Sequence, residues 1–195
     1  MAAFAAGAVI LVALVTVVLV TQLGHSGTPT AQGSATPADA RSSASAAARK
    51  QAAVQLSGLL AKSVKDRSAI LTAVHDVDVC GAQLTQDPQV FTRAAASRQK
   101  LLTQLTGLAG RSALSSAMLA DLTSAWQNSI QADQDLATWA RDEASRRCKR
   151  YQSNPAEAAA VAPSERATAA KQAFARLWDP MASQYGLPTY QPTQL

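Results

Sequence analysis

The amino-acid sequence predicts an all-α protein that consists of an N-terminal transmembrane helix, a flexible linker and an antiparallel four-helix bundle. An uncharged apolar run lies near the N-terminus, and a stretch of small and polar residues follows it. Over the rest of the chain, apolar side chains recur at steps of three and four residues, the period of a helix with one buried face. The sequence shows neither strand-like alternation nor an internal repeat.

Size and charge limit what the protein can be. The chain has 195 residues, and about 150 remain beyond the apolar run and the linker, enough for one ordinary domain with one core. With 18 Lys and Arg against 13 Asp and Glu, the net charge is +5. This excess is too small and too dispersed to be typical of a nucleic-acid-binding protein, so nucleic acid is not expected as a partner.

Residues 1–23 are predicted to be a membrane anchor. Phe4 to Leu23 carries no charge, and its 20 residues, at about 1.5 Å of rise each, match the roughly 30 Å hydrocarbon layer of a bilayer. The alternative is a cleaved signal peptide, which would have a shorter apolar region, about 7 to 15 residues, and a nearby cleavage site. The only candidate for that site, Gly24-His25-Ser26, fits poorly, so an uncleaved signal anchor is favoured.

Charges beside the anchor do not fix its orientation. The first basic residue is Arg41, whereas a signal anchor usually has Lys or Arg close to its cytoplasmic end. The missing basic flank leaves open a chain that begins inside a longer gene product. The two cysteines discussed below favour a single-pass cell-membrane protein whose C-terminal domain lies outside the cytoplasm.

Residues 24–46 are predicted to be a flexible linker of Ser, Thr, Gly, Pro and Ala. They include no bulky apolar side chain that could offset the entropy lost when a chain becomes ordered. A flexible segment of this length spans roughly 25 to 30 Å on average.

Residues 47–188 are predicted to form the helical bundle. The first helix covers 47–80, and the second begins at the capping pair Asp87-Pro88 and runs to residue 109. Short loops between amphipathic helices favour an arrangement in which successive helices run in opposite directions.

The third helix is predicted to begin at Ser112 and to reach residue 151, because Asn154-Pro155 would end it. The fourth is predicted to open at Pro163 and to stop at Gly186, where a Pro two residues later prevents continuation. Residues 189–195 are predicted to be a disordered tail.

Two cysteines are predicted to form a disulfide. Cys80 falls at the end of the first helix and Cys148 near the end of the third, and in an antiparallel bundle those ends lie at the same pole. A bridge that closes a loop of this length stabilises a fold by roughly 4 kcal/mol in the chain-entropy model. The alternative is two free thiols in a cytoplasmic protein.

Three charged residues fall on otherwise apolar helix faces, namely Arg67, Arg98 and Asp133. If both cysteines mark the same height, Asp133 lies about 3 Å in height from Arg67 at the rise of a helix. An isolated buried ion is costly, so we expect Arg67 and Asp133 to form an internal ion pair, which Arg98 would be free to join. The alternative is that these side chains reach the surface.

The one dense charge cluster is a basic run near the end of the third helix. Cations there complement the helix dipole, and they also offer a contact for an anionic surface or an acidic partner. The run consists of Arg146, Arg147, Lys149 and Arg150.

No catalytic, metal or cofactor site is predicted. His75, Asp76, Asp78 and Cys80 are close in sequence, but zinc requires convergent ligands and the only other histidine, His25, lies in the linker. A single histidine in the bundle region offers no catalytic triad, and no Gly-rich phosphate loop is present.

These observations predict a single-pass, membrane-anchored extracytoplasmic helical-bundle module without catalytic activity. Its expected partners are the membrane, through the N-terminal helix, and a protein or an anionic component of the cell envelope. The alternative is the extracellular sensor domain of a longer receptor whose cytoplasmic part would lie upstream.

Overall fold

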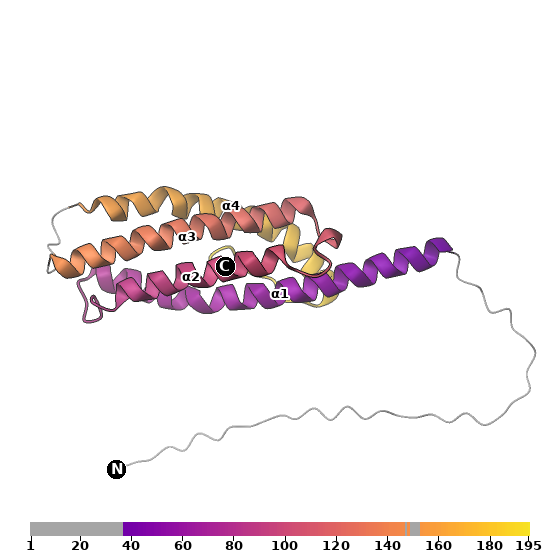
Figure 1. Cartoon of the computed structure of the whole chain (residues 1–195), viewed down its shortest axis with the longest axis horizontal. Coiled ribbons are helices and arrows are strands. Elements are labelled where there is room, and N and C mark those ends of the chain that lie inside the picture. The colour runs from indigo at the N-terminus through magenta and orange to yellow at the C-terminus, as the bar shows by residue number, and fades with distance from the viewer. Residues whose placement is uncertain (1–36, 147, 149–152) are drawn as a thin grey trace, which may run out of the picture. The chain divides into compact units, whose positions relative to one another are not determined.

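The computed structural model describes residues 37–146, 148 and 153–195, and over these residues the chain is all-helical. It contains four α-helices and one 3₁₀ turn, and no strand is present in these ranges (Figure 1). The predicted all-α class is therefore confirmed for this part of the chain. The elements are α1 (Pro37–Asp78), α2 (Asp87–Thr106), η1 (Arg111–Ala113), α3 (Ser116–Ser145) and α4 (Pro155–Tyr185).

Successive helices run in opposite directions, as Figure 1 shows. α1 packs mainly on α2, α2 on α3, and α3 most extensively on α4. α1 and α4, by contrast, approach each other at few points. The bundle is therefore tightly packed except along the line between α1 and α4, which we call the α1/α4 seam.

The first helix begins earlier than the sequence predicts. Residues 37–46, predicted to belong to the linker, form the first turns of α1, whose side chains from Arg41 to Gln51 are exposed. Alanine-rich sequence favours helix, and Pro37 is tolerated because the first helical residue needs no N–H donor. The predicted anchor at 1–23 and the remaining linker residues lie outside the described part of the chain, and no helix within that part is long and apolar enough to cross a bilayer.

Other helix boundaries also differ from the prediction. The hydroxyl of Ser115, not that of Ser112, caps α3 by accepting the amide of Met118 at 3.4 Å. Asn154-Pro155 opens α4 and does not end α3, which already ends at Ser145 and not near residue 151. The Asn154 side chain accepts the amide of Ala156 at 3.0 Å, and Pro155 occupies the first turn of α4.

The end of α4 is as predicted. Gly186 has a φ of 65°, and the following residue, Leu187, donates its amide to the carbonyl of Ala182 at 2.8 Å. This left-handed cap turns the chain back along the bundle.

The tail at 189–195, predicted to be disordered, instead packs on the bundle. Trp178 donates its indole N–H to the carbonyl of Pro188 at 3.0 Å, and the side chain of Leu195 is only 1% exposed. Burial of Leu195, with Tyr190 packed against the same core, offsets the entropy cost of ordering these residues.

The hydrophobic core consists of two separate clusters along the bundle. One surrounds Trp126, Phe174 and Trp178, and the other surrounds Phe91 and Trp139 near the end that carries the cysteines. On α1, α2 and α3, the residues that lie between the two clusters include Arg67, Arg98 and Asp133 respectively. A layer of polar residues therefore interrupts the core near its middle.

Cys80 and Cys148 are joined as a disulfide pair, with their Cα atoms 5.8 Å apart. The structure thus brings together the two helix ends that the topology argument placed at one pole. Both cysteines have left-handed backbones, with φ of 57° and 52°. The amide of Cys148 donates to the carbonyl of Glu143 at 2.8 Å, so this residue also closes the end of α3.

Replacing both cysteines by Ser should lower the free energy of unfolding by about 2–5 kcal/mol, because the bridge restricts the unfolded chain. Denaturant titration of the double variant should match that of the reduced wild-type protein, which serves as the control. Equal stability of oxidised and reduced wild type would show that the bridge does not constrain the chain.

Candidate functional site

The polar layer contains three charged side chains that are almost fully buried. Arg98 from α2 is 2% exposed, Asp133 from α3 is 3% exposed and Lys171 from α4 is 7% exposed. Charged groups are rarely buried unless they are paired, because removal from water costs several kcal/mol per ion. Their presence together in the middle of the bundle marks this layer as the part of the structure that packing alone does not explain.

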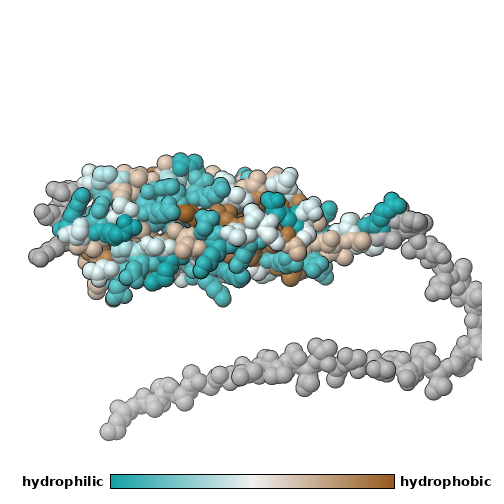
Figure 2. Space-filling view, in the orientation of Figure 1, coloured by the Kyte–Doolittle hydropathy of each residue, from teal (hydrophilic) through white to brown (hydrophobic). Residues whose placement is uncertain are grey.

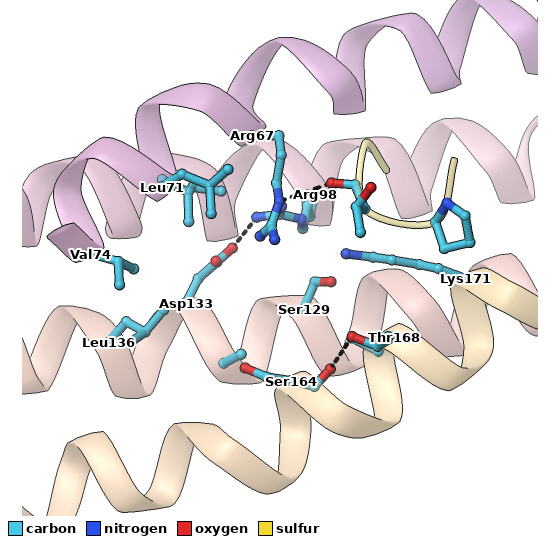
Figure 3. Close-up of a pocket in the computed structure, with 15 residues that line it drawn as sticks. Arg67, Leu71, Val74, Arg98, Ser129, Asp133, Leu136, Ser164, Thr168 and Lys171 are labelled. Carbon is cyan, nitrogen blue, oxygen red and sulfur yellow. Dashed lines mark hydrogen bonds and ion pairs between the residues drawn. The ribbon is translucent and has the colours of Figure 1, made fainter. Parts of the chain in front are cut away.

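Asp133 is paired with Arg98. The Nη1 of Arg98 donates to the Oδ2 of Asp133, and both side chains are buried (Figure 3). The Nε of Arg98 is also buried, but it has no hydrogen-bond partner. The pair therefore satisfies the carboxylate while leaving part of the guanidinium unsatisfied.

The sequence-based prediction that Arg67 pairs with Asp133 was wrong. Arg67 is partly buried and donates its Nε to the carbonyl of Thr193 in the C-terminal tail at 3.2 Å. The prediction considered only height along the bundle. In the structure α1 has few contacts with α3, whereas α2 packs directly on α3. Arg98 on α2 is for that reason the arginine that reaches the carboxylate.

Lys171 has no hydrogen bond or ion pair to any described residue, although only 7% of its surface is exposed. In Figure 3 its ammonium points toward the middle of the polar layer, where Arg98 and Ser129 also lie. Ser129 is also a buried residue, and its hydroxyl likewise has no hydrogen-bond partner among the described residues. Two polar groups from adjacent helices therefore face a common space without bonding to each other.

This space is a pocket of about 310 Å³ beside the α1/α4 seam. α1 and α4 form its two sides, α3 lies between them, and Pro192 and Thr193 of the tail form one edge. Its lining residues are Arg67, Ile70, Leu71, Val74, Arg98, Ser129, Ala132, Asp133, Leu136, Ser164, Ala167, Thr168, Lys171, Pro192 and Thr193.

Burial and neighbouring charges shift the protonation of these groups. Burial, and after it the charges of Arg98 and Arg67, lower the pKa of Lys171 to about 7 against the attraction of Asp133. Burial likewise lowers the pKa of Arg67, with the charge of Arg98 acting in the same direction. Burial raises the pKa of Asp133 to about 6, although contact with Arg98 opposes the rise. At neutral pH the pocket therefore carries a surplus of positive charge.

The lowered pKa of Lys171 has a cost in stability. Between about pH 7 and 10.5 the unfolded chain binds a proton that the folded chain does not, so stability rises with pH in this range. Below pH 7 the penalty is present in full. A ligand that stabilises the charged ammonium would remove part of it.

The pocket offers positive charge and hydrogen-bond donors. None of its lining residues is His or Cys, and no group of three potential metal ligands occurs within the described residues. Its cations and hydroxyls are groups that can bind a negatively charged group.

Arg146, the one residue of the predicted basic run that the structure describes, does not line this pocket. Arg146 is exposed and follows the last residue of α3, while Arg147, Lys149 and Arg150 lie outside the described residues. The contact of the basic run with an anionic surface stays a prediction.

Lys171 is the site residue that sequence reasoning missed. It lies four residues after Ala167 and three before Phe174, both of which are buried on α4. The same spacing rule that singled out Arg67, Arg98 and Asp133 would have found it.

No protein-family model matches the sequence, and comparisons with curated proteins and with solved structures find no significant match.

Replacing Asp133 by Asn should destabilise the protein by about 3–5 kcal/mol, because it leaves Arg98 buried without a counter-ion. Arg67→Met should cost about 1 kcal/mol or less, since the side chain of Arg67 is partly exposed and pairs with no carboxylate. Arg98→Met combined with Asp133→Leu should be milder than the sum of the single changes. Denaturant unfolding measures all five variants, and a larger loss for Arg67→Met than for Arg98→Met would contradict the observed pairing.

Proposed function

We propose that the chain is a membrane-anchored, extracytoplasmic binding module that holds a small anionic ligand in the pocket beside the α1/α4 seam. The observation that supports this proposal is Lys171, a buried lysine with no partner among the described residues, facing a pocket that Arg67 and Arg98 also line. Only one carboxylate, that of Asp133, balances these three cations within the pocket lining.

An anion in the pocket would supply the partner that Lys171 lacks among the described residues. Asp133 already neutralises Arg98, so the surplus charge resides on Lys171 and Arg67. A ligand carboxylate or phosphate would accept hydrogen bonds from Lys171 and Ser129, and charge-assisted hydrogen bonds of this kind are among the strongest in proteins. The binding energy would come from groups that the folded chain already holds in place.

The character of the bundle surface favours binding in the pocket over binding on a broad docking face. In Figure 2 the visible face is mainly hydrophilic, and hydrophobic residues show through it in small patches. The exposed large apolar residues come from separate positions along the chain, and isolated ones are normal on a soluble domain. An anionic group carried by a cell-envelope component or by a protein would still be able to enter the pocket through the seam.

The anchor and the location are part of the proposal. Residues 1–23 would span the cell membrane, the residues up to α1 would form the linker, and the bundle would lie outside the cytoplasm. Disulfides persist in oxidising compartments, so the bond between Cys80 and Cys148 supports this placement.

A sensor domain of a longer receptor is the second candidate. α1 supplies Arg67, Leu71 and Val74 to the pocket, and it is also the helix that continues the chain from the predicted anchor. A ligand in the pocket would thus contact the helix best placed to report its binding. A long cytoplasmic domain in the upstream reading frame would favour this candidate, and a short basic flank would favour the module.

Full-length protein in non-ionic detergent should bind a small anion in a saturable manner and gain thermal stability from it. The panel would be the sodium salts of acetate, phenylacetate, succinate, phosphate and sulfate at pH 6.5, with ionic strength held constant by sodium chloride. Binding should be at least tenfold weaker in Lys171→Met, because the variant removes the unpartnered cation. Lys65→Met, which changes an exposed lysine on α1, is the matched control and should bind as wild type does.

Two outcomes would contradict the proposal. One is that no anion of the panel stabilises the wild-type protein beyond the effect of chloride. The other is that Lys171→Met binds as tightly as Lys65→Met.

A further inference from the structure

The pocket has two chemically different ends. Lys171 lies at one end, and Leu71, Val74 and Leu136 lie at the other (Figure 3). Arg98 and Asp133 lie between the two ends. A purely polar ion would fill only one end, so the shape and chemistry of the lining favour a ligand with a charged head and an apolar body.

The volume limits how large that body can be. An apolar cavity of about 150 Å³ is enough to hold benzene. The pocket measures about 310 Å³, which leaves room for one ring, or a branched aliphatic group of similar size, together with a carboxylate. Ligand pockets commonly begin near about 300 Å³, so this one is suited to a small molecule and not to a polymer segment.

The charges favour one negative charge over two. With Arg98 paired to Asp133, the groups left to bind an anion are Lys171 and Arg67, and Arg67 already donates one N–H to the tail. The carboxylate of Asp133 lines the same pocket and would repel a second negative charge. A carboxylate needs fewer donors than a phosphate dianion, and Lys171 and Ser129 supply them at the polar end.

We infer that the ligand is a small amphipathic monocarboxylate. Its carboxylate lies against Lys171 and within reach of Arg67 and Ser129, and its ring or branched aliphatic body lies against Leu71, Val74 and Leu136. This inference rests on the proposed function, because it names the chemical class of the anion that the pocket binds.

The apolar body should contribute most of the discrimination among anions. Burying a ring-sized apolar surface favours binding in proportion to its area, whereas acetate presents only a methyl group to the same wall. The carboxylate should in turn discriminate against a neutral molecule of the same shape, which would leave Lys171 unpaired. Both parts of the ligand are therefore needed for tight binding.

Isothermal titration of the full-length protein in detergent at pH 6.5 tests the inference with four probes. These are phenylacetate, acetate, inorganic phosphate and the neutral analogue 2-phenylethanol. Phenylacetate should bind at least tenfold more tightly than each of the other three. Its advantage over 2-phenylethanol should disappear in Lys171→Met and persist in the control Lys65→Met.

A substitution at the apolar end of the pocket should weaken only the contacts that the apolar body of the ligand makes. Leu71→Gln alters a half-exposed residue, so the variant should fold, and it should weaken phenylacetate binding severalfold while leaving acetate binding unchanged. Val74→Thr provides a second, nearly isosteric change at the same end. Leu177→Gln, at an exposed leucine outside the pocket lining, is the matched control.

The outcomes separate this inference from the proposed function. If acetate or phosphate binds in a Lys171-dependent manner and phenylacetate is no tighter, the ligand class is wrong and the anion pocket stands. If no anion binds, both fail. If 2-phenylethanol binds as tightly as phenylacetate and Lys171→Met has no effect, the pocket is only an apolar cavity and both fail.

Discussion

The buried ion pair between Arg98 and Asp133 is the interaction on which the rest of this structure depends. It lies where the two hydrophobic clusters meet and ties α2 to α3. An unpaired charge at this depth would cost several kcal/mol, so a slip of either helix along the other is strongly opposed. The pair therefore fixes the register of the bundle and also prevents its middle from closing into a continuous apolar core.

The pocket follows from this polar layer and from the loose α1/α4 seam. Hydrophobic clusters close both ends of the bundle, and the disulfide together with the buried bond from Asn154 to Glu143 holds one of those ends. At the seam, the tail occupies part of the space and accepts a hydrogen bond from Arg67. Lys171 is thus held in a rigid frame that does not supply its counter-ion, and such preorganisation lowers the entropy cost of binding one.

The sequence predicts the class of the fold better than its details. Helical periodicity was enough to predict four helices, because it depends only on the spacing of apolar residues along the chain. The positions of Cys80 and Cys148 at the ends of two helices were enough to predict that the two cysteines meet at one pole of the bundle. The boundaries near Pro37 and Pro155 were missed because proline is compatible with both the start and the end of a helix. Arg98 and Asp133 were recognised as buried, but their partners depend on which helices touch, and height along a bundle does not determine that. The tail was missed because its one buried leucine is invisible to any test of periodicity.

Lys171 is buried without a counter-ion among the described residues, and we propose that a small anion supplies one. This proposal can be tested by titrating the lysine ammonium groups by NMR after ¹³C reductive methylation, with Lys171→Met used to assign the signal. In the free protein the pKa of Lys171 should be about 7, because burial disfavours the charged form. Saturating phenylacetate should raise this pKa, since the bound anion stabilises the ammonium. A pKa near the ordinary value of lysine in the free protein, or one that phenylacetate does not change, would show that Lys171 does not bind the anion as proposed.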